Sequence, residues 1–144
     1  MGIVRQLLED KSCQVWYVTP SSSVLEALKL MAEKRIGAVV VVEGGKIVGI
    51  FSERDFARKA ISGQITMHTP VREIMVSPVY YVTPDQTVED CMVLMTQHRF
   101  RHLPVLEDNQ LVGIISIGDV VKRLLVEKDA EIKSLEDYIW VNMI

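Results

Sequence analysis

Hydrophobic and polar positions follow the same order twice along the chain, 64 residues apart. Residues 15–59 align with residues 79–123 without a gap, and 16 of the 45 aligned positions are identical. Chance alone gives about three identities at ordinary composition. A repeat of this length indicates one supersecondary unit that is built twice, with the two copies packing together to bury their apolar faces.

Each copy predicts the element order β-α-β-β-α. A β-branched and aromatic run ended by Thr-Pro predicts the first strand, because proline lacks a donor for the ladder. Apolar positions at intervals of three and four then predict a helix, and two apolar runs joined by a tight turn predict a hairpin before a second helix. The expected elements are 15–18, 23–34, 38–42, 47–51 and 53–61 in the first copy, and 80–82, 87–98, 103–106, 111–115 and 118–128 in the second.

The fold class that follows is α+β, with two tandem β-α-β-β-α repeats packed about a pseudo-twofold axis. A short helical phrase precedes each copy, Val4 to Leu8 and Val71 to Met75. Ile132, Leu135 and Ile139 add an amphipathic C-terminal helix. We therefore expect four segments: repeat 1 with the N-terminal helix (1–61), a linker (62–70), repeat 2 (71–128) and a C-terminal helical tail (129–144).

Composition narrows the class of protein. The 144 residues are 49% hydrophobic and 24% charged, which is an ordinary globular balance. The net charge of -3 disfavours a nucleic-acid partner. No apolar run reaches the roughly 18–20 residues of a membrane helix, and the first ten residues lack a signal-peptide pattern, so we expect a cytoplasmic protein without a membrane partner. Cys13 and Cys91 occupy non-equivalent positions, and we expect no disulfide between them.

The most informative local motif is Gly-h-h-Ser-x-x-Asp, where h is hydrophobic, found at residues 49–55 and 113–119. One interpretation is structural: Ser caps the following helix and the acid three residues later completes a capping box. The other is functional: a helix N-terminus suits a phosphate, and an Asp one turn in suits a ribose diol. Retention of Gly, Ser and Asp in both copies favours the functional interpretation.

Catalysis and metal binding are not expected. No His lies at a matching offset from Ser52 or Ser116, and no P-loop, HExxH or CxxC motif occurs. His98 and His102 stand four residues apart, as a helix-borne metal pair would. The predicted helix ends near His98, however, and no third ligand stands nearby, so we predict neither an enzyme nor a metal site.

Taken together, these features resemble a pair of CBS domains, also called a Bateman module, over about residues 4–128. The resemblance lies in the Thr-Pro after the first strand, the run Arg99 to Val105 and the two Ser-x-x-Asp junctions. The phrases Ser-Glu-Arg-Asp and Ser-Ile-Gly-Asp are similar to those of stand-alone bacterial members. The resemblance implies a signal-sensing module that binds AMP, ADP, ATP or NAD(H), with S-adenosylmethionine ranked lower. It also implies a homodimer and a regulated protein partner that reads ligand occupancy.

The resemblance further implies two ligand clefts between the repeats. Each combines the Ser-x-x-Asp junction of one repeat with the first-strand end and second-strand start of the other. In this scheme Asp holds the ribose, Ser and Thr hold the phosphate, and apolar residues contact the adenine. The first cleft would contain Ser52, Arg54, Asp55, Val82, Thr83, Arg101, His102 and Leu103. The second would contain Ser116, Asp119, Val18, Thr19, Gly37, Ala38 and Val39.

The two copies differ at positions that matter for ligand charge. Arg54 stands where the second copy has Gly118, and Arg101-His102 stand where the first copy has Gly37-Ala38. We therefore expect the Asp55 cleft to be the more basic one, to favour the more heavily phosphorylated group, and to be occupied differently from the Asp119 cleft. The alternative function is a dimerisation scaffold without a physiological ligand; the retained Ser and Asp pairs favour sensing.

Overall fold

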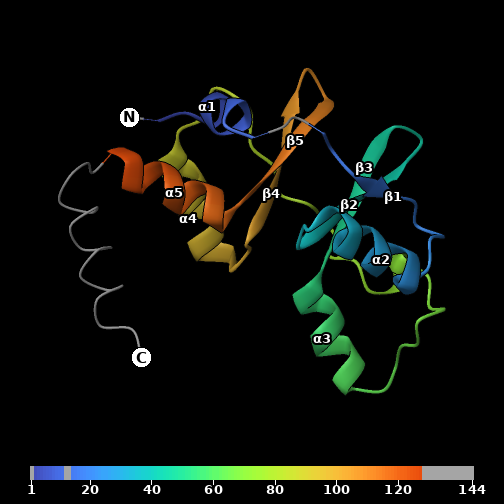
Figure 1. Cartoon of the computed structure of the whole chain (residues 1–144). Helices are drawn as coiled ribbons and strands as arrows, with labels where there is room; N and C mark the ends of the chain where they lie inside the picture. Colours follow the sequence, from blue (N-terminus) through green and yellow to red (C-terminus); the bar gives the residue numbers. More distant parts are fainter. Residues whose placement is uncertain (1, 12–13, 128–144) are drawn as a thin grey trace, which may run out of the picture. The chain divides into compact units, whose positions relative to one another are not determined.

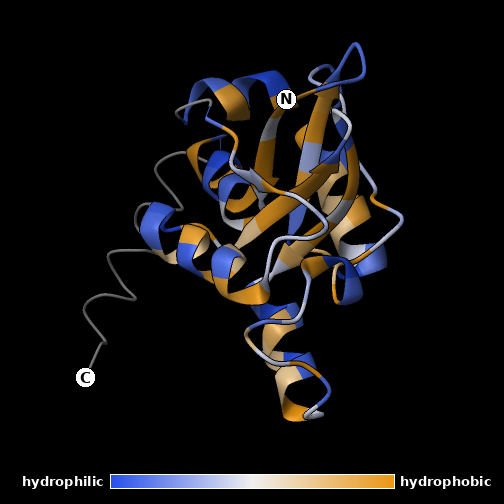
Figure 2. Cartoon of the chain, turned by 90° about the vertical axis from the view of Figure 1, so that its right-hand side faces the viewer, coloured by the Kyte–Doolittle hydropathy of each residue, from blue (hydrophilic) through white to orange (hydrophobic). Residues whose placement is uncertain are grey.

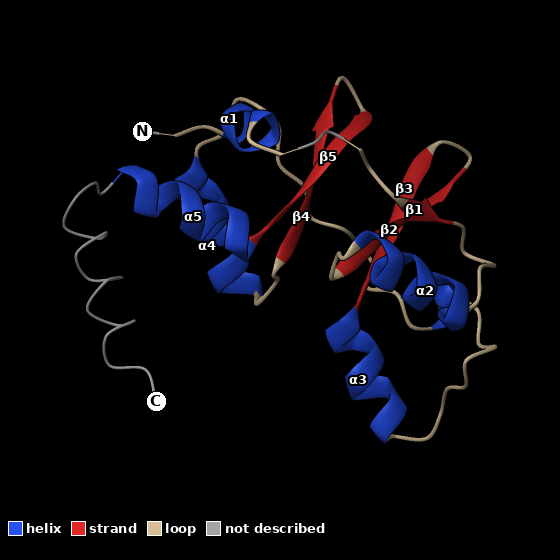
Figure 3. Ribbon diagram, in the orientation of Figure 1, coloured by secondary structure: helices blue, strands red, loops and turns tan. Residues whose placement is uncertain are grey.

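The computed structural model describes residues 2–11 and 14–127 of the chain. They form two compact units, each built around one of the repeats (Figure 1). The unit of the first repeat contains residues 14–81 with 108–111; that of the second contains residues 2–11, 82–107 and 112–127. Helices and small sheets occur in both units, which confirms the predicted α+β class (Figure 3). The predicted C-terminal tail (129–144) and Cys13 lie outside the described residues.

The unit of the first repeat has one three-stranded sheet. Its strands lie in the order β1-β2-β3, with β1 parallel and β3 antiparallel to the central β2. Val39 and Val41 of β2 belong to the core with Phe51 of β3. The elements are β1 (Tyr17–Val18), α2 (Val24–Lys34), β2 (Ala38–Glu43), β3 (Lys46–Ser52), α3 (Glu53–Ile61) and the 3₁₀-helix η1 (Val71–Glu73).

The unit of the second repeat contains α1 (Val4–Glu9), α4 (Val88–His98), β4 (His102–Glu107), α5 (Ile117–Glu127) and most of β5 (Gln110–Ser116), from Val112 onward. Strands β4 and β5 pair, and Leu103, Val105 and Ile115 are fully buried in the core. The strand expected over 80–82 is reduced to one parallel bridge between Val82 and Val105. Of these three residues, Val82 is buried, whereas Tyr80 and Tyr81 are exposed.

Turns and helix starts follow the sequence closely. Gly44 and Gly45 both have positive φ, as do Asp108 and Asn109, which confirms the tight hairpin turns. Ser23, Ser52 and Thr87 cap α2, α3 and α4, each with an acid three residues later. Local hydrogen bonding by these side chains satisfies donors that the first helical turn leaves unpaired. The helix boundaries were therefore predictable to within a residue or two.

Each unit contains the short helical phrase that precedes the other repeat in the chain. Helix α1 packs with the second repeat, where Val4 N–H donates to the Gln86 carbonyl at 2.8 Å. At the equivalent place, Val71 N–H donates to the Ser22 carbonyl of the first repeat at 2.8 Å. The predicted segment 1–61 follows the sequence repeat and groups the N-terminal helix with the first repeat, whereas the contacts of α1 lie with the second.

Hydropathy agrees with this organisation. Figure 2 shows the strands mainly in hydrophobic colours and the helices with both hydrophobic and hydrophilic stretches. Each unit has its own core cluster, and no polar or charged side chain in the described ranges is classed as buried. Among the helices of these ranges, none is both long and apolar enough to cross a membrane.

Candidate functional site

The first Ser-x-x-Asp junction lies where β3 passes into α3. Asp55 Oδ2 accepts hydrogen bonds from the Ser52 backbone N–H at 2.9 Å and from the Ser52 hydroxyl at 2.8 Å. Asp55 N–H donates in turn to Ser52 Oγ at 3.2 Å. The capping box predicted as the structural interpretation is therefore present, and it holds the carboxylate at the start of the helix. Both side chains are only partly buried, which leaves them within reach of a ligand.

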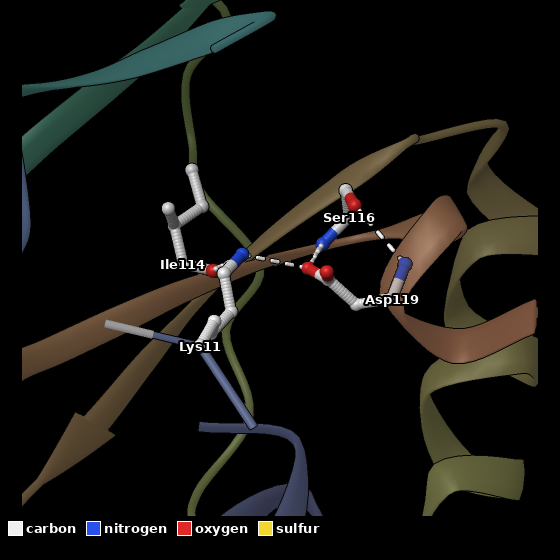
Figure 4. Close-up of polar contacts among 4 residues, drawn as sticks. All are labelled: Lys11, Ile114, Ser116 and Asp119. Atoms are coloured by element: carbon white, nitrogen blue, oxygen red, sulfur yellow. Dashed lines mark hydrogen bonds and ion pairs between the residues drawn. The ribbon is translucent and has the colours of Figure 1, made fainter. Parts of the chain in front are cut away.

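The second junction, between β5 and α5, repeats this geometry and adds a cation. Ser116 N–H donates to Asp119 Oδ2 at 2.8 Å, and Asp119 N–H donates to Ser116 Oγ at 3.2 Å. Lys11 Nζ donates to the same Asp119 Oδ2 at 2.7 Å and to the Ile114 carbonyl at 3.1 Å (Figure 4). An ion pair joins the segment after α1 to the start of α5 within one compact unit.

The surroundings of Asp119 favour its charged form. Burial of the carboxyl group opposes ionisation, but the hydrogen bonds from Lys11 and from the Ser116 backbone N–H outweigh it. The pKa of Asp119 is consequently held below its ordinary value of 3.8. The group is a carboxylate at neutral pH, as a hydrogen-bond acceptor for a ribose diol must be.

The glycines of the motif have a packing role. A Cβ on Gly49 would collide with the Met75 side chain, and one on Gly113 would collide with Leu8. Met75 and Leu8 close the two helical phrases that precede the repeats, so each glycine admits the leading segment of its own unit. The presence of glycine in both copies is thus explained by the packing of Met75 and Leu8, without a ligand contact.

The start of each second strand lies beside the junction of the same repeat. Ala38 pairs with Ser52 in the β2–β3 register, and Glu53 N–H donates to the Gly37 carbonyl at 3.1 Å. In the second repeat, Ile117 N–H donates to the Arg101 carbonyl at 2.8 Å. Arg101 and Arg54 are exposed and His102 is partly exposed, so the polar candidates lie at the surface around the two helix starts.

The apolar candidates are core residues. Val18 and Val39 belong to the core of the first unit, Val82 and Leu103 to that of the second, and Ala38 is also buried. Their side chains are committed to packing, which leaves their backbone groups as the part available to a ligand. Thr19 and Thr83 follow directly on the first-strand positions, and their side chains are exposed.

The other reactive groups that the structure describes do not form a second site. Burial, aided by the nearby charge of Asp90, raises the pKa of the Cys91 thiol to about 11, so this thiol is a poor nucleophile. His98 stacks on Phe100 with ring centroids 5.7 Å apart. Across residues 2–11 and 14–127, no three His, Cys, Asp or Glu side chains gather as a metal-binding group would.

Lys11 is the residue that sequence reasoning missed. It lies 108 positions before Asp119, outside the aligned repeats, and Pro78 stands at the matching place after the second helical phrase. Comparison of the repeats therefore gives no sign of the contact. Lys11 also adds a cation to the junction that the sequence made the less basic of the two.

Chemically, each junction offers groups that can hold a polar ligand. It offers a carboxylate for hydroxyl groups, a serine hydroxyl, and a helix start with its partial positive charge. No histidine is among the hydrogen-bond partners given above for either serine in the described ranges. The arrangement suits reversible binding.

Comparison with known proteins agrees with the duplicated fold. The family model of the CBS domain matches this chain twice, at residues 4–62 and 71–126. The mitochondrial CBS domain-containing protein CBSX3 of Arabidopsis thaliana is 39% identical over 129 residues, which cover 85% of this chain and 63% of that protein. The relatives also include a bacterial stand-alone protein, as predicted: the CBS domain-containing protein YhcV of Bacillus subtilis is 35% identical over 122 residues, which cover 85% of this chain and 87% of that protein.

Two solved structures are informative. A putative signal-transduction protein with CBS domains from Burkholderia ambifaria is 46% identical, with a TM-score of 0.83, covering 88% of this chain and 96% of that one. CBSX2 in complex with AMP is 28% identical, with a TM-score of 0.70, covering 89% of this chain and 99% of that one. Proteins with such CBS pairs are generally regulatory rather than catalytic. The chain belongs to the CBS-domain family, with two CBS domains in tandem.

Proposed function

We propose that this protein is a signal-sensing module that binds adenosine-containing nucleotides at its two Ser-x-x-Asp junctions and passes ligand occupancy to a protein partner. The observation that carries the proposal is the construction of the same polar junction twice. In each, the backbone N–H of the serine holds the aspartate at a helix start. A carboxylate fixed in this way can accept hydrogen bonds from ribose hydroxyls, and the helix start can receive a phosphate.

The ligand class rests on the family. CBSX2, to which this chain is similar, has been solved in complex with AMP. We propose AMP, ADP, ATP or NAD(H) as ligands, with S-adenosylmethionine ranked lower. The proposed contacts are those given in the sequence analysis. Asp55 and Asp119 would hold ribose, and Ser52 and Ser116 would contact phosphate.

Transmission requires that the ligand prefer one arrangement of the protein over another. A ligand that binds two arrangements equally shifts neither, whatever its affinity. The partner that reads the arrangement is a second protein, and we propose a homodimer as the working form and the cytoplasm as its location. Met92 and Val93 on α4, and Val121 and Val126 on α5, are exposed apolar residues of the kind that self-association would cover.

Isothermal titration calorimetry on Asp55→Ala and Asp119→Ala tests ligand binding. We expect each variant to lose a different binding step for AMP or ATP, since the two junctions differ in charge. Asp90→Ala is the matched control: Asp90 completes a capping box with Thr87 at α4 but stands at no proposed site. It should lose the same capping energy, about 1 kcal/mol, and keep both binding steps. Equal losses of one and the same step in both junction variants would contradict unequal junctions.

The second candidate function is a dimerisation scaffold without a physiological ligand, which the exposed apolar residues of α4 and α5 favour. A thermal-shift panel with AMP, ATP, NADH and S-adenosylmethionine separates the two functions. A saturating ligand at one hundred times its dissociation constant adds about 2.7 kcal/mol to the free energy of unfolding. Stabilisation by one of these ligands supports sensing, and none at millimolar concentration, together with a dimer in light scattering, supports the scaffold.

A further inference from the structure

The two junctions differ in the partner of the carboxylate. At Asp55, Oδ2 accepts one bond from the Ser52 backbone and one from its neutral hydroxyl. At Asp119, Oδ2 accepts one bond from the Ser116 backbone and one from the Lys11 ammonium. No basic side chain of residues 2–11 or 14–127 forms an ion pair with Asp55. A charged group thus contacts one aspartate and not the other.

The Lys11 ammonium has two hydrogen-bond acceptors, yet a ligand can reach and displace it. Its ammonium also donates to the Ile114 carbonyl, so two acceptors fix its position. The side chains of Lys11 and Asp119 are 36% and 26% exposed. Water and a ligand can therefore reach the pair, and solvent screening keeps the ion pair weak enough to break.

A ribose diol at Asp119 has to compete with Lys11. A carboxylate oxygen offers about two lone-pair directions, and Ser116 and Lys11 already take those of Oδ2. A diol that uses both carboxylate oxygens must displace the Lys11 ammonium from Oδ2. At Asp55 the corresponding displacement involves only a serine hydroxyl, which rotates freely and carries no charge.

Displacement also changes the balance of charge. Uncharged adenosine would take the hydrogen-bonding place of Lys11 on Asp119 and bring no negative group for the ammonium, which keeps its bond to the Ile114 carbonyl. A nucleotide brings a phosphate of charge about -1.5 to -2 at neutral pH, which can pair with the released ammonium. The same step is thus unfavourable with a nucleoside and compensated with a nucleotide.

We propose that Lys11 sets the ligand selectivity of the Asp119 junction, by disfavouring uncharged nucleosides relative to nucleotides that carry a phosphate. The proposal rests on the proposed nucleotide-binding function. It assigns to the segment after α1 a role in ligand choice at the Asp119 junction, 108 positions later in the chain. It also means that the Asp119 junction discriminates by charge although its own motif contains no basic residue.

Site-resolved NMR titration of the full chain tests this selectivity, with adenosine and AMP as probes. Backbone amides of Ser116 and Asp119 report the second junction, and those of Ser52 and Asp55 report the first. In Lys11→Met, the preference for AMP over adenosine at Ser116 and Asp119 should fall about tenfold, through tighter adenosine binding and weaker AMP binding. The preference at Ser52 and Asp55 should stay unchanged.

Three further variants complete the experiment. Lys11→Gln, which also lacks the charge, must show the same fall, and it serves if Lys11→Met does not fold. Lys11→Arg keeps the charge and should keep the wild-type preference. Lys122→Met removes an exposed lysine of α5 that forms no ion pair within the described residues, and should also keep it.

The outcomes separate this inference from the proposed function. If AMP binds at Ser116 and Asp119 in the wild type but the preference is unchanged in Lys11→Met and Lys11→Gln, the selectivity role of Lys11 is wrong and nucleotide binding stands. If AMP shifts no junction resonance in the wild type, the proposed function fails, and the inference fails with it.

Discussion

At the scale of single residues, the two aspartates show how equal motifs acquire unequal chemistry. Asp55 and Asp119 each accept a hydrogen bond from the backbone N–H of the serine three residues earlier. The Lys11 ammonium then makes Asp119 half of an ion pair and lowers its pKa. A motif therefore fixes the shape of a site, while a distant residue fixes its charge.

The lowered pKa of Asp119 predicts a pH dependence of stability. The carboxylate contributes stability that is fully present above the unfolded pKa of about 3.8 and is lost as pH falls through the lower folded value. Asp119→Asn should therefore be less stable than the wild type at neutral pH, by about 1 kcal/mol or less for a pair with this exposure. Urea unfolding at a series of pH values should show this difference shrinking below about pH 4.

Lys11→Met is the control for that measurement, because Lys11 is the charged side chain that contacts Asp119 in the described ranges. With the ion pair removed, the acid loss of stability should be smaller than in the wild type. A difference between wild type and Asp119→Asn that stays constant down to the acid limit would show that Lys11 does not stabilise the carboxylate.

At the scale of elements, the repeated helical phrases explain the repeated glycines. Leu8 lies on Gly113 and Met75 lies on Gly49, so a short leading segment covers the fourth position of β5 and of β3. The hydrogen bonds of the two segments are equivalent as well, since Arg5 N–H donates to the Pro84 carbonyl and Arg72 N–H to that of Pro20. Each segment is thus a fixed part of its unit.

Glycine-to-alanine substitutions test this packing. Gly49→Ala and Gly113→Ala should each lower the free energy of unfolding by about 1–3 kcal/mol, because the new methyl group overlaps Met75 or Leu8. Gly118→Ala is the control: its Cβ would meet only Ser116 Oγ, at 3.5 Å, inside helix α5. It should be neutral or stabilising by up to about 1 kcal/mol. Chemical denaturation measures all three.

A double substitution sharpens the test. If the overlap with Met75 is the cause, shortening that side chain should remove most of the penalty, so Gly49→Ala should cost far less in a Met75→Ala background. Additive effects of the two substitutions would point to another cause, such as a change in the strand itself.

At the scale of the whole molecule, sequence repeats and compact units do not have the same membership. Helix α1 precedes the first repeat in the chain and packs with the second, with Leu7 in that core. Residues 71–75 precede the second repeat and pack with the first, with Ile74 in that core. The chain therefore passes between the units more often than a simple tandem order requires.

This membership predicts which strands a core substitution in each helical phrase destabilises. Leu7→Ala should cost about 2–5 kcal/mol and should raise amide hydrogen exchange in β4 and β5, more than in β2 and β3. Ile74→Ala, at the equivalent position of the second phrase, should do the reverse. The same pattern of exchange in both variants would contradict the assignment of each segment to its unit.

The sequence by itself determined the repeat, the order of elements, the tight turns and the helix starts, because these depend on neighbours a few residues away. Gly44-Gly45 and Asp108-Asn109 need only their own backbone freedom, and Ser52 and Asp55 need only each other. Val39 and Leu103 lie in the runs predicted as strands, and both are core residues.

Only the tertiary structure decided which unit receives each helical phrase, why the motif glycines are retained, and which cation meets Asp119. Lys11 reaches that carboxylate across 108 positions of chain, and neither residue carries any local sign of the other. Such contacts depend on the path of the folded backbone, which brings together residues that no periodicity or repeat relates.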